Sequence, residues 1–326
     1  MTEPSSAVRR LVQAMPKAEL HLHLDGCLRP QTAIELAQRF GIDAPRTWAA
    51  MFDALVADAH PGSQAELLKS FELPLQLMQH PEALARITTE LVEDKAADRV
   101  RYMEIKWAPA FHCAAGLTVE EVIETVASAA SAAAERFGVV VRLTVVALRS
   151  SSPADTVAVA HAAVAHRASG VTGFDLAGFE AADPDPTVHA AAFDVARAGG
   201  LGITLHSGEL PDNGALVWRA LDMRPDRIAH GASGVHAASR TTFAASGAPW
   251  PNCICPAAAS TGSPAFSPTI SSCRSTADCR IQSARYSSSW RPSTIARDFL
   301  AASSASQRCA GVSGRIDVLS GAERRA

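Results

Sequence analysis

Between Ala18 and about His236, short runs of β-branched and apolar residues alternate with longer segments in which apolar residues recur at helical spacing. The short runs predict strands at Glu19–Leu24, Val100–Trp107, Val139–Ala147, Gly170–Ala177, Leu201–His206 and Arg227–His230. The longer segments predict helices at Pro30–Phe40, Pro81–Asp98, Val119–Phe137, Pro153–Ala168, Pro186–Ala198 and Gly214–Met223. Strands that alternate with helices of this length are typical of βα units on a parallel sheet.

The number and order of these units predict an α/β fold of the TIM (β/α)8 barrel type, with two further units still to come after His230. A doubly wound sheet is the alternative, and it is disfavoured because no G-x-G-x-x-G turn follows the first strand. Residues 43–80 exceed the connection that a barrel needs and predict one or two short helices. Because this insertion follows the first strand, it is either a lid over the active-site face or an addition to the packing.

The alternation of predicted strands and helices ends after Ala238. Residues 241–326 contain 17 of the 30 Ser and five of the seven Cys, and their apolar positions follow neither period 2 nor period 3.6. We therefore expect two parts, a barrel over residues 1–240 and an atypical Ser- and Cys-rich tail over residues 241–326. A tail of this kind would disrupt the seventh and eighth strands. Cys253 and Cys255 form a C-x-C pair, but no second pair lies at zinc-finger spacing.

Composition narrows the class of protein. The chain of 326 residues is 48% apolar and 19% charged, which excludes a disordered chain. A net charge of −3 provides no basic excess for a nucleic-acid partner. No run of 18 apolar residues predicts a membrane helix, the N-terminus does not resemble a signal peptide, and sparse cysteines argue against a disulfide framework. These features lead us to expect a cytoplasmic protein.

The candidate chemistry lies where predicted strands end. His21 and His23 are two residues apart on a strand, so both imidazoles point to one face. His206 ends another strand and could supply the third ligand of an open zinc site. Glu209, on the loop that follows, could act as a general acid or base. His230 ends the next strand and could orient or deprotonate a water molecule.

Two further positions complete the set. Asp25 follows the paired histidines, and Gly178 follows the fourth strand, where its backbone N–H could bond a ligand. Each of these residues alone is more simply structural, but barrels place catalysis where strands end. His112 could line the same cleft, whereas we expect His161, His166 and His189 on the surfaces of helices.

Together the motifs resemble those of the adenosine deaminase family of metal-dependent amidohydrolases. The matching segments are PKAELHLHLDG (16–26), LRPQT (28–32), KWAP (106–109), GFDLAG (173–178), HSGE (206–209) and RIAHG (227–231). The family usually has Ala where Ser207 stands.

The resemblance implies an amidohydrolase-type barrel with one Zn²⁺ per chain. It implies that His21, His23 and His206 are zinc ligands. Glu209 would be the proton donor to the purine ring, and His230 would position the attacking water. Asp25 and Gly178 would contact the substrate, and His23 would contact it as well. The implied reaction is hydrolytic deamination of a small purine nucleoside, adenosine, to inosine and ammonia, as in purine salvage.

The tail departs from the family pattern. The family has an Asp ligand at the end of the eighth strand, expected near residues 285–290, where this chain has Arg-Tyr-Ser-Ser-Ser-Trp. Asp278 is the nearest preceding acid, and it does not lie in a convincing strand. We hypothesise that the reading frame shifts near residues 238–245, and we expect little or no deaminase activity from the chain as it stands.

Three alternatives remain. A deaminase of adenine or another 6-aminopurine shares the same motifs. A binuclear amidohydrolase would need a bridging Lys at the end of a central strand, and it is disfavoured because the only Lys on a predicted strand, Lys106, lies on the second. The chain could also be an inactive relative.

Overall fold

The computed structural model describes residues 6–56, 68–209 and 214–235, and their strands form one parallel sheet in chain order. The strands are β1 (Lys17–His23), β2 (Val100–Trp107), β3 (Val140–Leu148), β4 (Val171–Ala177), β5 (Gly202–Ser207) and β6 (Arg227–His230). Each strand pairs in parallel with the next one along the chain. This order, in which consecutive strands are neighbours, is the one expected of a barrel.

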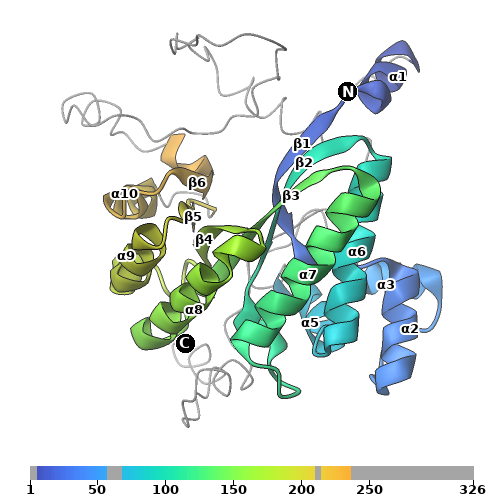
Figure 1. Ribbon diagram of the computed structural model, residues 1–326, viewed down its shortest axis with the longest axis horizontal. Helices are drawn as coiled ribbons and strands as arrows, with labels where there is room; N and C mark the ends of the chain where they lie inside the picture. Colours follow the sequence, from blue (N-terminus) through green and yellow to red (C-terminus); the bar gives the residue numbers. More distant parts are fainter. Residues whose placement is uncertain (1–5, 57–67, 210–213, 236–326) are drawn as a thin grey trace, which may run out of the picture.

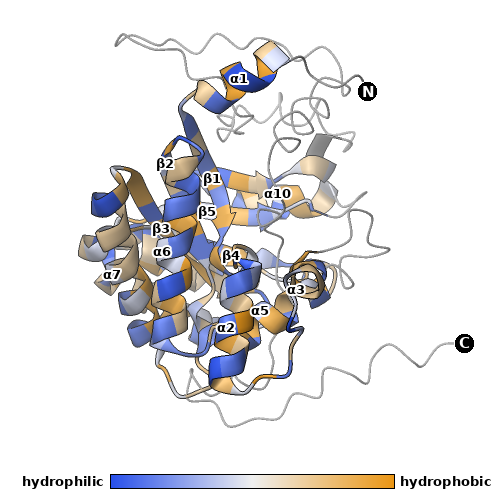
Figure 2. Cartoon of the chain, turned by 90° about the vertical axis from the view of Figure 1, so that its right-hand side faces the viewer, coloured by the Kyte–Doolittle hydropathy of each residue, from blue (hydrophilic) through white to orange (hydrophobic). Residues whose placement is uncertain are grey.

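Helices connect the strands and cover the outside of the sheet (Figure 1). They are α1 (Ser6–Ala14), α2 (Pro30–Phe40), α3 (Trp48–Leu55), α5 (Glu72–Leu77), α6 (Pro81–Ala97), α7 (Val119–Phe137), α8 (Pro153–Ala165), α9 (Ala190–Ala198) and α10 (Gly214–Asp222). None of the helices in the described ranges is long and apolar enough to cross a membrane. In Figures 1 and 2, α1 projects beyond the start of β1, and it buries no residue.

The sheet curls strongly. In a flat sheet, β1 and β5 would lie about 19 Å apart, because neighbouring strands are about 4.8 Å apart. Instead, the Nε2 atoms of His21 on β1 and His206 on β5 are 3.0 Å apart. The six strands therefore form a nearly closed barrel surrounded by helices, which confirms the predicted TIM-like α/β fold. The predicted disruption of strands seven and eight, and the tail over residues 241–326, lie outside the described residues.

Helix α7 shows how local sequence fixes an element. Thr118 accepts a hydrogen bond from the backbone of Glu121, and the Glu121 carboxylate accepts one from the backbone of Thr118, which forms a capping box. Gly138 ends the helix in the left-handed conformation. Between these ends, Val122, Ile123 and Val126 are fully buried.

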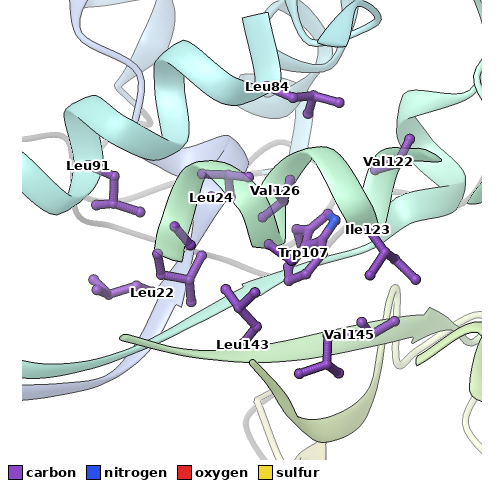
Figure 3. Packing of buried hydrophobic residues seen from close by; sticks show 14 of the residues in the cluster. Leu22, Leu24, Leu84, Leu91, Trp107, Val122, Ile123, Val126, Leu143 and Val145 are labelled. Carbon is purple, nitrogen blue, oxygen red and sulfur yellow. The ribbon is translucent and has the colours of Figure 1, made fainter. Parts of the chain in front are cut away.

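Those side chains pack on the strands in the core shown in Figure 3, where Leu22, Trp107, Leu143 and Val145 lie beneath the helices. Burial of a side chain of this size contributes about 1.5–3 kcal/mol. The core thus holds β1, β2 and β3 in register, and these strands set the position of the histidines on β1.

Most predicted boundaries agree with the observed ones. β2, β6, α2 and α7 begin and end where the pattern placed them. The predicted helix Pro153–Ala168 ends earlier, at Ala165, and a 3-10 turn follows it. The insertion contains α3 and α5, in line with the expected short helices. Helix α1 was not predicted, although Val8 and Leu11 lie at helical spacing; both side chains are exposed, so this apolar pattern does not mark a face that packs on the core.

Candidate metal centre and active site

Three imidazoles meet inside the barrel, where β1 and β5 end. The Nε2 atoms of His21 and His23 are 2.9 Å apart, those of His23 and His206 are 3.2 Å apart, and those of His21 and His206 are 3.0 Å apart. His23 and His206 are buried, at 0% and 3% exposed, and His21 is half-buried. The three nitrogens therefore surround one point, although their residues lie far apart in the sequence.

The triangle suits a single zinc ion. Two nitrogens that are each about 2.05 Å from one tetrahedral zinc lie about 3.3 Å apart, close to the observed separations. Burial lowers the pKa of His21 well below its ordinary value, and the positive charge of Lys106 lowers it further. A neutral imidazole has the lone pair that a metal ligand needs. Both the spacing of the three nitrogens and the neutral state favoured at His21 thus fit a bound cation.

Asp175 fixes the orientation of His206. Its Oδ1 lies 3.0 Å from His206 Nδ1, and its Oδ2 lies 2.6 Å from Lys106 Nζ. All three side chains are buried. Burial alone would raise the pKa of Asp175, but His206 and Lys106 outweigh it and hold the pKa well below its ordinary value. An ionised Asp175 accepts a hydrogen bond from His206 Nδ1–H, and this tautomer places the lone pair on Nε2, the nitrogen that could bind a metal.

His230 lies beside the triangle. Its ring centroid is 5.0 Å from that of His21 and 5.2 Å from that of His206. One nitrogen each from His21, His206 and His230 lie within 4.8 Å of one another, a wider set than the first. The tighter triangle, which contains His23, is the set that fits one ion, because its separations of 2.9–3.2 Å lie close to the value of about 3.3 Å for two nitrogens on one tetrahedral zinc. This places His230 next to the candidate metal position.

The backbone of His230 is strained. Its φ angle is +69°, a left-handed conformation that is uncommon for a residue with a side chain. His230 Nε2 lies 3.7 Å from Oε1 of Glu209, and their side chains are 24% and 16% exposed. Strain of this kind clusters at functional sites, where it aims a side chain in a particular direction. Here the direction brings a carboxyl group and an imidazole together at the rim of the histidine cluster.

Asp25 lines a pocket at the same mouth. Asp25 is fully buried in the 3-10 turn after β1. The pocket has a volume of about 190 Å³, and the insertion supplies much of its apolar wall through Trp48 and Phe52, whose rings stack with centroids 5.1 Å apart. Met51 of the same helix is fully buried. The insertion thus lines the pocket on one face and packs on the other.

Gly178 follows β4 at the same end of the barrel. Its φ angle is +140°, and a side chain there would lie 3.3 Å from Arg149. Both observations favour glycine at this position.

The structure adds residues that the sequence analysis did not place in the site. Asp175 lies within the GFDLAG segment, and Lys106 was considered only as a bridging ligand. Each is a charged residue between two apolar neighbours on a strand, which is a signal that it needs a buried partner. His189 is also a correction: it was expected on the surface but is 2% exposed, and its ring bonds to Thr156 and to the carbonyl of Arg149.

Comparison with known proteins identifies the family of the chain. The family model for adenosine deaminase matches residues 16–256. An adenosine deaminase from Clostridium kluyveri is 34% identical over 227 residues, which cover 69% of this chain and 64% of the relative. One from Mycobacterium marinum is 39% identical, covering 68% of this chain and 62% of the relative. The matched part of the chain therefore spans less than two thirds of these relatives.

Solved structures show the same likeness. A zinc-bound amidohydrolase from Burkholderia ambifaria superimposes with a TM-score of 0.66 and 30% identity, covering 75% of this chain and 66% of that one. An adenine deaminase from Arthrobacter aurescens gives a TM-score of 0.62 and 27% identity, covering 71% and 69%. An N6-mAMP deaminase from Arabidopsis superimposes with a TM-score of 0.58 and 29% identity, covering 68% of this chain and 66% of that one. The chain belongs to the adenosine deaminase family.

Proposed function

We propose that the site of this chain is built for the zinc-dependent hydrolytic deamination of adenosine, or of a related 6-aminopurine, to inosine (or the corresponding 6-oxopurine) and ammonia, and that the atypical tail lowers the turnover of the chain as it stands. The observation that carries the proposal is the convergence of three histidine Nε2 atoms, 2.9–3.2 Å apart, in a barrel of this family. Glu209 and His230 lie beside them and supply groups that can move protons.

His21, His23 and His206 would hold one zinc ion per chain. A bound zinc ion lowers the pKa of a water molecule from 15.7 towards about 7, which supplies a nucleophile at neutral pH. Asp175 and Lys106 hold His206 in the tautomer that leaves Nε2 available. A zinc-bound relative with 30% identity supports this choice of metal.

The other residues act on the purine. Glu209 donates a proton to N1 of the ring, which draws electron density from C6 and opens that carbon to attack. His230 orients the attacking water and accepts its proton. Asp25 accepts a hydrogen bond from a ribose hydroxyl, and the backbone N–H of Gly178 donates one to the purine. His23 borders the same space and also contacts the substrate.

Adenosine is the first candidate substrate, because the curated relatives are adenosine deaminases. The buried carboxylate of Asp25 beside an apolar pocket also suits a ribose hydroxyl. Adenine is the second candidate, supported by the likeness to an adenine deaminase. The Asp ligand that the family has on its eighth strand is expected in a part of this chain outside the described residues, so an inactive relative that still binds zinc is the remaining alternative.

The test uses the full chain, purified without metal and loaded with zinc. Zinc content is measured first, and ammonia release is then followed with adenosine and with adenine, in the unchanged chain and in Glu209→Gln. We expect one zinc per chain and a turnover, low in the unchanged chain, that Glu209→Gln abolishes. Zinc binding without turnover would identify an inactive relative. Failure to bind zinc, or turnover that survives Glu209→Gln, would contradict the proposed mechanism.

A further inference from the structure

A buried carboxylate from another strand holds the turn that carries Glu209. Glu180 lies three residues beyond β4 and is 2% exposed. Its Oε1 accepts hydrogen bonds from Ser207 Oγ at 2.8 Å and from the backbone N–H of Gly208 at 2.9 Å. Its Oε2 accepts from the N–H groups of Gly208 at 3.1 Å and of Glu209 at 3.2 Å. Every partner donates, so Glu180 acts here as an acceptor only.

The shape of the turn requires such an acceptor. Gly208 has a φ angle of +73°, and a methyl group there would lie 2.5 Å from Val217 Cγ2, so the backbone is confined to this path. The path turns the N–H groups of Gly208 and Glu209 towards one side, which makes a small concave site for an anion. Buried N–H groups must be paired, and the Glu180 carboxylate pairs both.

Arg149 holds the same segment from its other end. This residue follows β3 and is 3% exposed, and its Nη2 donates to the carbonyl oxygen of His206 at 2.7 Å. A cation thus bonds the carbonyl group before Ser207, and an anion bonds the two amide groups after it. Hydrogen bonds to charged groups are about twice as strong as those between neutral groups.

The position of this turn decides where the Glu209 carboxyl group lies. Glu209 Oε1 is 3.7 Å from His230 Nε2, at the rim of the histidine cluster. We propose that Glu180 is a positioning residue, whose carboxylate fixes the turn at residues 207–209 so that Glu209 faces the substrate. The inference rests on the proposed function, in which Glu209 is the proton donor.

Ser207 gives the turn one extra bond. The family usually has Ala at this position, so the 2.8 Å bond from the hydroxyl to Glu180 is an addition in this chain. Ser207→Ala removes that bond and leaves both backbone N–H bonds in place. Glu180→Gln removes one acceptor oxygen and replaces it with an NH₂ group, which repels the N–H donors.

The test compares the zinc-loaded full chain with Glu180→Gln, Ser207→Ala and Glu104→Gln. Glu104 is the matched control: it is a carboxylate at 7% exposed that bonds Tyr102 and Arg227, away from the turn. Hydrogen exchange of the peptide covering residues 206–209 is measured by mass spectrometry, and kcat and KM are measured with adenosine.

In Glu180→Gln we expect amide exchange in the turn to accelerate about tenfold or more, because one of the two acceptor oxygens is replaced by a donor. We expect kcat to fall on the order of a hundredfold, as a displacement of about 1 Å can cause. KM should stay within about threefold, because the interaction acts in the transition state. Ser207→Ala should change kcat only a few-fold, and Glu104→Gln should leave the exchange of the turn unchanged.

Unchanged protection of the turn in Glu180→Gln, or faster exchange with unchanged kcat, would overturn the positioning role. If the unchanged chain does not turn over adenosine, the proposed function fails separately. Crystal structures of the unchanged chain and Glu180→Gln then decide the inference. It stands if the Glu209 carboxyl group moves by about 1 Å relative to His230, and a shift below about 0.5 Å overturns it.

Discussion

Replacing Asp175 with Asn should both destabilise the barrel and weaken its affinity for zinc. The Asp175 carboxylate lies 2.6 Å from Lys106 Nζ, and their side chains are 0% and 2% exposed. The substitution preserves the shape but leaves the Lys106 ammonium buried without a counter-charge. Removing one partner of such a pair lowers the free energy of unfolding by about 3–5 kcal/mol. Losing the carboxylate that bonds His206 Nδ1 should weaken zinc binding about 10–100-fold.

Urea unfolding of the metal-free chain measures the first effect, and competition with a chelator measures the second. Lys106→Met in the Asp175→Asn background should restore part of the stability, because it removes the unpaired charge, but it should not restore zinc affinity. Asp194→Asn is the control, since Asp194 pairs with Arg197 at the surface and should change neither quantity measurably. A loss of stability below about 1 kcal/mol in Asp175→Asn would refute the assigned pairing.

Other predictions follow from single features. Burial lowers the pKa of His112 to about 4, so the unfolded chain gains a proton below about pH 6.5 that the folded chain does not take up. The free energy of unfolding should therefore fall by about 1.4 kcal/mol per pH unit between pH 6.5 and 4, and urea unfolding of His112→Gln should show a flatter profile. Gly208→Ala should lower Tm more than Gly41→Ala, because both glycines have positive φ but only Gly208 would clash with Val217; equal losses would exclude the clash. Zinc at a hundred times its Kd should stabilise the chain by about 2.7 kcal/mol, an effect seen as a rise in Tm that a chelator reverses. Translation of the encoding DNA in its other two frames should reveal Thr-Asp-Asp or Thr-Asp-Asn within about 60 codons of His230, and its absence from both frames rejects the frame-shift hypothesis.

The sequence predicted those parts of the site that depend on strand periodicity. His21 and His23 share a face because alternate residues on a strand do, and His206 and His230 could be placed because they end predicted strands. The pairing of Lys106 with Asp175 could not be predicted, because it joins β2 to β4 across the barrel interior. Spacing along one strand carries no information about which residue of another strand lies opposite.

Contacts made by loop residues were even harder to predict from the sequence. Glu180 reaches the turn after β5 from the loop after β4, and both loops lack any periodic pattern. The wrong prediction that His189 is exposed has a similar cause, because the position of a residue on a helix does not indicate which neighbouring loop covers it. His189 is covered by the segment that contains Arg149.

The metal triangle joins parts of the chain that are synthesised far apart in time. His21 and His206 are separated by 185 positions, so the site cannot assemble until β5 has left the ribosome and docked against the preceding strands. A nascent chain that ends before β5 contains only two of the three proposed ligands. Because few such sites exist before folding, the measured zinc affinity includes the free energy of closing this part of the barrel. The rate of zinc uptake during refolding would therefore report when β1 and β5 come together, which measures how fast this part of the barrel closes.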